Sequence, residues 1–142
     1  MGLTFYKDIN IIMSDLDTYN KQADLCTDAS EYVAWLQGLA RGIRIDHSKR
    51  LPHNSVAGCS APVWIGGEKN SDGTFEFWFS CDSTYVNGLG KILTDVYNGK
   101  TKEEIMAIKF RDFGPVSKFL LFERKRSFQK FINKIYSIVL NS

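Results

Sequence analysis

Residues 62–81 read PVWIGGEKNSDGTFEFWFSC, and this stretch decides the fold. Two strand-like runs, Pro62 to Lys69 and Thr74 to about Cys81, are separated by a short polar linker that ends in Asp72-Gly73. Asp-Gly between two such runs is a strong hairpin signal. In the second run, the phenylalanines alternate with residues that include Trp78, so aromatic side chains fall on both faces. The pattern predicts an antiparallel hairpin that is at least partly covered on both faces.

The turn also predicts a register for this hairpin. If the loop spans residues 70–73, counting back along the two strands places Pro62 opposite Cys81. Side chains that face each other across two strands have Cβ atoms about 4.5–5.5 Å apart. We therefore expect Cys81 to lie within a few residues of Cys59, at the same end of the hairpin.

Helical patterns flank the hairpin on both sides. Helix starts are predicted at Asp28, at Asp82-Ser83 and at Thr101, each with a side chain that can accept a hydrogen bond from a free backbone N–H. The second of these helices should stop at Gly99, and a last helix should run from about Arg124 to Leu140. Apolar residues recur at helical spacing along three of the four helices: Tyr32, Trp35, Leu36, Leu39 and Ile43; Val86, Leu89, Ile92, Leu93 and Val96; Phe128, Phe131, Ile132, Ile135 and Val139.

The rest of the chain has weaker patterns. Phe5 to about Ser14 is expected to form a short helix, residues 45–57 a polar surface loop, and Gly114-Pro115 a break before a segment around 116–121. A chain of 142 residues with an ordinary apolar fraction fits one domain with one core. Helices around a small antiparallel sheet, with its hairpin at about 62–81, predict a single α+β domain over residues 1–142.

One cysteine lies directly before the hairpin, at the end of the run Asn54-Ser55-Val56-Ala57-Gly58-Cys59. The small residues before it, and Gly58 next to it, favour a loop that presents the thiol near water. A structural cysteine more often lies inside a strand or helix as a small hydrophobe. The residues alone leave both interpretations of Cys59 open, because reactivity depends on an environment that favours the thiolate.

The charge and composition of the chain argue against several classes of function. A net charge of +2 argues against a nucleic-acid surface that extends over the whole protein. Residues 101–142 carry nine basic and four acidic residues, so the last helix could dock on an acidic partner or be a solvated face. We expect no membrane contact, because no apolar run approaches the length of a bilayer span. The absence of a signal peptide and of a Cys-x-x-Cys motif favours free thiols in the reducing cytoplasm.

Other residues with reactive or metal-binding side chains are few. The three cysteines and two histidines lack the close pairs typical of zinc ligands, so no metal site is expected. His53 lies six residues before Cys59 and could act as its base, or be solvated. Cys81 could be a second thiol that relays or resolves a bond to Cys59, or could fill a strand end. Cys26 has no predicted thiol neighbour and is expected to be inert.

The order of several segments resembles the SufE family, the sulfur acceptors that assist cysteine desulfurases in iron–sulfur cluster assembly. The run that ends in Cys59, followed by Val63-Trp64-Ile65, is similar to the family's signature around its active cysteine. The segment from Asp82 is similar to the start of the family's central helix, and the segment from Arg124 resembles its closing Arg-x-x-Gly-Leu helix. The resemblance covers about residues 28–139.

The resemblance implies a function in sulfur transfer. A pyridoxal-phosphate desulfurase takes sulfur from cysteine and holds it as a persulfide. The thiolate of Cys59 would attack the outer sulfur, carry it as a new persulfide and pass it to an iron–sulfur scaffold protein. The chain would need no cofactor of its own and would be an accessory protein that stimulates the desulfurase rather than a stand-alone enzyme. Five further residues would support the loop or bind the partner: Val56, Gly58, Trp64, Asp82 and Arg124.

The chain departs from the family's pattern at three places. Ala61 and Cys81 stand where the family usually has serine, and Ser127-Phe128 replaces the usual Gly-Leu. Two other functions therefore stay open. One is a non-catalytic binding module of the same fold that holds a partner with its basic C-terminal helix. The other is a redox switch formed by Cys59 and Cys81.

Overall fold

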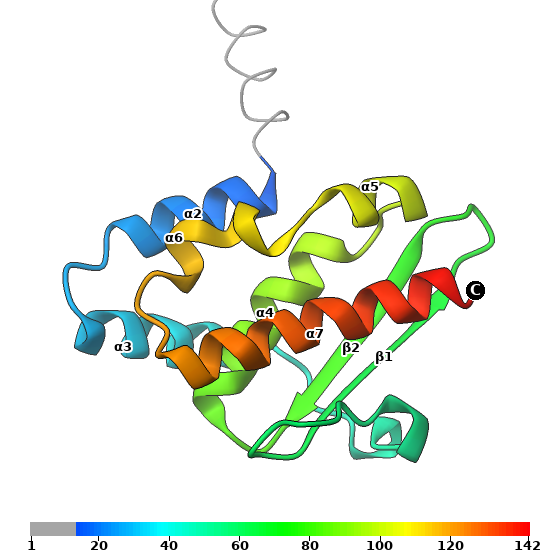
Figure 1. Cartoon of the computed structure of the whole chain (residues 1–142), viewed down its shortest axis with the longest axis horizontal. Helices are drawn as coiled ribbons and strands as arrows, with labels where there is room; N and C mark the ends of the chain where they lie inside the picture. The colour runs from blue at the N-terminus through cyan, green and yellow to red at the C-terminus, as the bar shows by residue number, and fades with distance from the viewer. Residues whose placement is uncertain (1–13) are drawn as a thin grey trace, which may run out of the picture.

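The structure, a computed structural model, describes residues 14–142 and contains a hairpin with α-helices gathered on one side of it (Figure 1). Within this range, β1 (Val63–Lys69) and β2 (Phe75–Cys81) form a two-stranded antiparallel sheet, which confirms the predicted α+β class. The α-helices are α2 (Asp15–Asp24), α3 (Ala29–Ala40), α4 (Thr84–Tyr97), α5 (Lys102–Ala107), α6 (Gly114–Ser117) and α7 (Phe122–Leu140). The helix predicted from Phe5 to Ser14 lies outside the described residues, except for Ser14, which caps α2.

The predicted register of the hairpin is wrong by one residue. Cys81 pairs with Val63 rather than with Pro62. The reason is the turn, in which the carboxylate of Asp72 accepts hydrogen bonds from the backbone N–H of Thr74 at 3.0 Å and from its hydroxyl at 2.6 Å. Thr74 is thereby held in a five-residue loop instead of entering the strand. A shift of one residue moves side chains to the other face of a sheet, and the observed pairing places Val63 on the same face as the buried phenylalanines.

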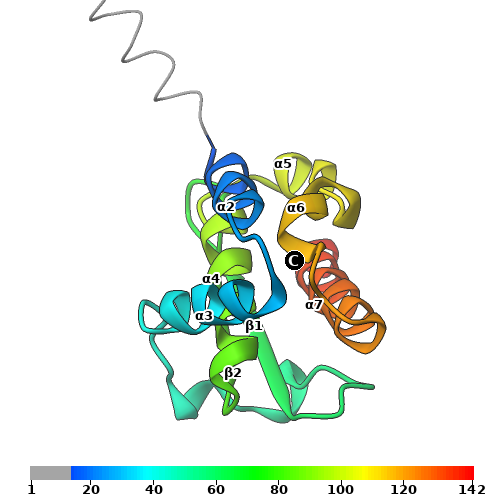
Figure 2. The same cartoon turned by 90° about the vertical axis from the view of Figure 1, so that its left-hand side faces the viewer.

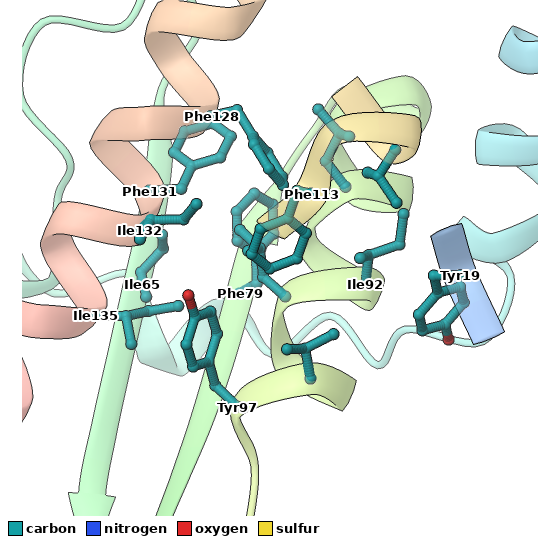
Figure 3. Packing of buried hydrophobic residues seen from close by; sticks show 14 of the residues in the cluster. Tyr19, Ile65, Phe79, Ile92, Tyr97, Phe113, Phe128, Phe131, Ile132 and Ile135 are labelled. Atoms are coloured by element: carbon teal, nitrogen blue, oxygen red, sulfur yellow. The ribbon is translucent and has the colours of Figure 1, made fainter. Parts of the chain in front are cut away.

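Helices α4 and α7 both pack on the phenylalanine face of the hairpin. The ring centroids of Phe79 and Phe131 lie 5.3 Å apart, and a Cβ added at Gly90 of α4 would lie 2.1 Å from the Phe79 ring. Figure 3 shows Phe79 between the side chains of α7 and the ribbon of α4. The core positions predicted for α4 and α7 are buried, and α3 contributes Tyr32 and Leu36.

Helix α3 lies beside α4, and the two cross closely (Figure 2). A Cβ added at Gly88 would lie 2.2 Å from the backbone oxygen of Leu36, so only glycine fits this crossing. The capping residues predicted for α3, α4 and α5 are confirmed. Asp28 accepts a hydrogen bond from the N–H of Glu31 at 2.8 Å, Ser83 caps α4, and Thr101 forms a capping box with Glu104.

The opposite face of the hairpin is covered in part by residues 47–54, which confirms the prediction that both faces are at least partly covered. This segment was predicted as a loop and contains two short 3₁₀ helices, η1 (His47–Lys49) and η2 (Pro52–Asn54). The ammonium of Lys49 lies 4.4 Å from the Trp78 ring centroid, and the guanidinium of Arg50 lies 4.5 Å from that of Trp64. The segment that leads to Cys59 is therefore packed against the sheet before the cysteine is reached.

Two features of the fold differ from prediction. Helix α2 was not predicted, because only two of its residues, Tyr19 and Ala23, are buried. Gly114-Pro115 begins α6 rather than breaking the chain, since proline suits the first turn of a helix, where no backbone donor is needed. Within residues 14–142, none of the helices combines the length and apolar character needed to cross a membrane.

Candidate functional site

The Cys59 loop, defined as residues 55–62, leads from η2 into β1. Its base is closed by backbone pairing, because the N–H of Val56 donates to the carbonyl of Val63 at 2.9 Å and Ser55 forms an antiparallel bridge with Trp64. At its tip, Gly58 adopts φ +79°, a left-handed conformation that favours glycine. The thiol thus lies on a loop directly after this glycine, as the sequence predicted.

Cys59 is half-buried rather than freely exposed. Its side chain packs against the edge of the hydrophobic core, as do those of Val56 and Ala61 in the same loop. The sequence predicted a thiol close to water, and the structure gives a position that is only partly open to water. A reagent or a partner protein can therefore reach the thiol only in part while the loop keeps this conformation.

Two lysines of α7 bind the backbone of the segment around the cysteine. The ammonium of Lys130 donates to the carbonyl of Gly58 at 2.6 Å, and that of Lys134 donates to the carbonyl of His53 at 2.7 Å. A shallow hollow of about 310 Å³ lies between the loop and α7 and is lined by Ser55, Val56, Ala57, Lys130, Asn133 and Lys134. Sequence reasoning did not select these lysines, although their spacing of four residues places them on one face of a helix.

Arg50 connects the loop segment with the open end of the hairpin, where Trp64 and Asp82 lie. Its Nε donates to the hydroxyl of buried Ser80 at 2.8 Å, and its Nη2 donates to the carboxylate of Asp82 at 2.8 Å. Its guanidinium also stacks on Trp64. The hydrogen bond from Arg50, followed by its charge, holds the pKa of the Asp82 carboxyl below its usual range. Two predicted site residues, Trp64 and Asp82, are therefore joined by an arginine that the sequence analysis did not select.

The other two cysteines are buried. Cys81 is 2% exposed, and its sulfur accepts a hydrogen bond from the N–H of Ser83 at 3.5 Å. It pairs with Val63, at the end of β1 nearest the Cys59 loop. Cys81 therefore lies at the same end of the hairpin as Cys59, as predicted. Burial, followed by the charge of Glu31, raises the pKa of the Cys26 thiol. All three cysteines of the chain are free thiols in the structure.

His53 is exposed and lies in η2, where its backbone carbonyl binds Lys134. Among residues 14–142, no hydrogen bond joins its imidazole to the Cys59 thiol, so its role as a base stays a prediction. In the same part of the chain, no group of three or more His, Cys, Asp or Glu side chains is placed to hold a metal ion.

Arg124 lies in the first turns of α7, at a second surface. Its guanidinium lies 5.4 Å from the ring centroid of Tyr85, and the two residues line an apolar pocket of about 350 Å³ together with Ala29, Val33, Phe119 and Leu121. Leu121 and Phe122 next to it are 78% and 73% exposed. Six residues of helix separate Arg124 from Lys130, which corresponds to about 9 Å along the helix axis. The same six residues rotate about 120° around the helix, so Arg124 and the lysine that binds the Cys59 loop lie on the same helix but point in different directions.

Comparison with known protein families shows to which family the chain belongs. A family model described as "SufE: Fe-S metabolism associated domain" matches residues 17–139. The chain belongs to the SufE family. Its function therefore lies in iron–sulfur metabolism, and the resemblance noted in the sequence is confirmed at the level of the family.

Two relatives of this SufE-family chain come from Arabidopsis thaliana. It is 26% identical over 123 residues to a chloroplastic quinolinate synthase and 25% identical over 109 residues to the chloroplastic SufE-like protein 2. These matches cover 85% and 77% of the present chain but only 16% and 40% of the relatives, so the chain spans less than half of either protein.

A solved structure is similar to the SufE-family chain in fold. It is the solution structure of a hypothetical protein from Thermus thermophilus, with a TM-score of 0.73 and 13% sequence identity. The match covers 90% of the present chain and 97% of the solved one. At this identity, the similarity concerns the fold alone.

Proposed function

We propose that this SufE-family protein takes sulfur from a cysteine desulfurase onto Cys59, stimulates that enzyme, and passes the sulfur to an iron–sulfur scaffold protein. The observation that carries the proposal is the placement of Cys59. It is a half-buried thiol on a closed loop, directly after a left-handed glycine, in a family of iron–sulfur metabolism. Partial burial suits a carrier, because a persulfide is then less open to water and oxidants between transfers.

The transfer is a thiol exchange that needs no external oxidant or reductant. The Cys59 thiolate attacks the outer sulfur of the desulfurase persulfide, so that a new S–S bond forms on Cys59. The S–S bond on the desulfurase breaks, and its cysteine leaves as a thiolate. The proton on the outer sulfur stays with that sulfur or is lost to water. Pyridoxal phosphate acts in the desulfurase, before this step, and this chain contributes the accepting thiol.

We assign the surface around Arg124 to contact with the desulfurase. It combines a cation with exposed Leu121 and Phe122 and an apolar pocket, as a protein-binding surface often does. Lys130, which binds the Cys59 loop, lies on the same helix about 9 Å further along its axis, so a partner docked at Arg124 would have to extend part of the way around α7 to reach the thiol. A charge reversal, Arg124→Glu, should weaken binding of the desulfurase while the reaction of Cys59 with a small alkylating reagent stays as in the wild type.

The direct test is incubation with a SufE-dependent cysteine desulfurase and L-cysteine, followed by intact-mass analysis. We expect a gain of one sulfur atom that maps to Cys59 and is removed by dithiothreitol. Cys59→Ser should abolish both this gain and the stimulation of the desulfurase, whereas Cys81→Ser should keep both. Full stimulation by Cys59→Ser would contradict the proposal and favour a binding module. A disulfide between Cys59 and Cys81 after mild oxidation would favour the redox switch.

A further inference from the structure

The contacts between α7 and the Cys59 loop involve side chains on one element and backbone carbonyls on the other. Lys130 and Lys134 lie four residues apart on α7, and each ammonium donates to one carbonyl of the segment that carries the cysteine. The two carbonyls belong to Gly58, next to Cys59, and to His53, before the base of the loop. Both lysine side chains are partly covered. The tip of the loop is thus held against α7 by Lys130, and the segment just before the loop is held by Lys134.

We propose that Lys130 and Lys134 form a latch that holds the Cys59 loop closed on α7 and so limits access to the thiol. The inference deepens the proposed function, on which its biological meaning rests, because it concerns how the accepting thiol becomes available. Lys130 is a positioning residue in this proposal. It acts on the backbone beside Cys59.

Two properties of glycine at position 58 allow this contact. Its φ of +79° turns the peptide into a conformation that residues with side chains rarely adopt. In addition, a Cβ added at Gly58 would lie 2.6 Å from the Nζ of Lys130, in the space that the ammonium occupies. Because glycine has no side chain, the backbone can adopt this turn, and the lysine ammonium has space to reach the carbonyl.

The latch differs from the bonds at the base of the loop. The base is tied by backbone pairing between Val56 and Val63, next to the hairpin. The tip is held by a flexible lysine whose ammonium remains near water, and such a bond is weaker than a buried one. Because this bond is exposed to water, its loss should change an opening equilibrium by about three- to tenfold, as for a hydrogen bond of ordinary strength. The latch can therefore open without unfolding of the hairpin.

The test measures access to the thiol in the isolated protein. Lys130→Met keeps most of the side-chain length and removes the ammonium. The rate of alkylation of Cys59 by iodoacetamide is followed by mass spectrometry as a function of pH, up to the plateau at which the thiol is ionised. We expect the plateau rate to rise about three- to tenfold in Lys130→Met. The rise should be smaller in Lys134→Met, because its bond lies five residues from Gly58. Lys130→Arg, which keeps a donor, should restore slow alkylation.

Lys125→Met is the matched control, because it removes the same charge from the same helix. Lys125 is exposed and makes no hydrogen bond to the loop in the described part of the chain, so its plateau rate should match the wild type. An unchanged plateau in Lys130→Met, or an equal rise in Lys125→Met, would overturn the latch. A shift of the pH midpoint without a change of plateau would also overturn it, since Lys130 would then act on ionisation rather than on access.

Folding is checked by circular dichroism and by alkylation of buried Cys26 and Cys81, which should stay slow. If Lys130→Met fails this check, Lys130→Leu, which also lacks a donor, is judged by the same criterion. The assay contains no desulfurase, so a failed latch would leave sulfur transfer to Cys59 untouched. Conversely, absence of sulfur transfer would leave the alkylation result standing.

Discussion

Replacing Arg50 with methionine should destabilise the hairpin end that supports the Cys59 loop. The Arg50 side chain is 14% exposed and makes three contacts at that end. Its Nε binds the hydroxyl of Ser80, its guanidinium stacks on Trp64 at 4.5 Å, and its Nη2 binds Asp82. Methionine keeps the apolar length of the side chain but provides none of these polar contacts.

The three contacts are unequal in magnitude. Ser80 is 1% exposed, and a buried hydroxyl that loses its partner costs about 1–3 kcal/mol. The stack on Trp64 adds about 0.5–1 kcal/mol. Asp82 is 83% exposed, so its ion pair is screened by water and adds little. We therefore expect Arg50→Met to lower the free energy of unfolding by about 1.5–4 kcal/mol, mostly through Ser80.

Urea unfolding at pH 7 measures this loss, which should appear as a lower midpoint with an unchanged slope. The double variant Arg50→Met with Ser80→Ala should lose less than the sum of the single variants, because no hydroxyl is then left unpaired. Arg44→Met replaces an exposed arginine six residues before Arg50. It is the control and should change stability by less than about 0.5 kcal/mol. The reasoning is refuted if Arg50→Met matches the control, or if Asp82→Asn is as damaging as Arg50→Met.

Three further predictions use urea or thermal unfolding. Gly88→Ala should destabilise the protein by about 1–3 kcal/mol or more, because the added Cβ would meet the backbone oxygen of Leu36. Gly38→Ala has open space around it and should stabilise α3 by about 0.5–1 kcal/mol. Equal effects of the two substitutions would contradict this packing. Gly58→Ala should destabilise by about 1–2 kcal/mol through its positive φ, and a neutral effect would show that the turn is not required. The pKa of Asp82 is lowered in the folded state, so its ion pair stabilises above the unfolded pKa of about 4 and is lost as pH falls through the folded value. The difference in stability between wild type and Asp82→Asn should therefore vanish in acid, and a difference that grows below pH 4 would contradict the pairing.

The helices and strands whose ends depend on nearby residues were predicted closely. Helix α4 begins after Ser83 and ends before Gly99, because a hydroxyl cap and a left-handed glycine act within a few residues. The apolar stripe of α7 is buried at every predicted position, since helical spacing leaves one face for the core. The two strands are predicted within one residue, because the polar linker that ends in Asp72-Gly73 marks the turn between them.

The features that were missed depend on contacts that a local pattern does not encode. The observed register differs from the predicted one by one residue, because the Asp72 side chain holds Thr74 in the turn. The sequence pattern fits a four-residue loop and a five-residue loop about equally well. Helix α2 gains its place from tertiary contacts, such as the hydrogen bond of Tyr19 to Asp95 of α4. Cys59 could be found from its flanking residues. Lys130 could not, because it meets Gly58 across 72 residues of sequence and only the packing of α7 brings them together.

The way the loop is anchored explains why weak bonds are enough to hold its tip. On the N-terminal side, Asn54 is buried, and its amide donates to the carbonyl of Lys49 at 2.8 Å. A Cβ at Gly66 of β1 would lie 2.2 Å from Nε1 of Trp78 and 2.9 Å from Nδ2 of Asn54, so these side chains fill the space above that glycine.

On the C-terminal side, the chain enters β1 at Val63, which is 2% exposed. Both ends of the loop are therefore fixed to the hairpin by buried contacts, and the freedom that remains lies between Val56 and Pro62. A segment this short has few conformations to lose on closing, and the entropy that opposes closure is correspondingly small. In the proposed latch, the hydrogen bond from Lys130 to the carbonyl of Gly58 can then decide whether the tip of the loop is held to α7 or is free to meet a partner.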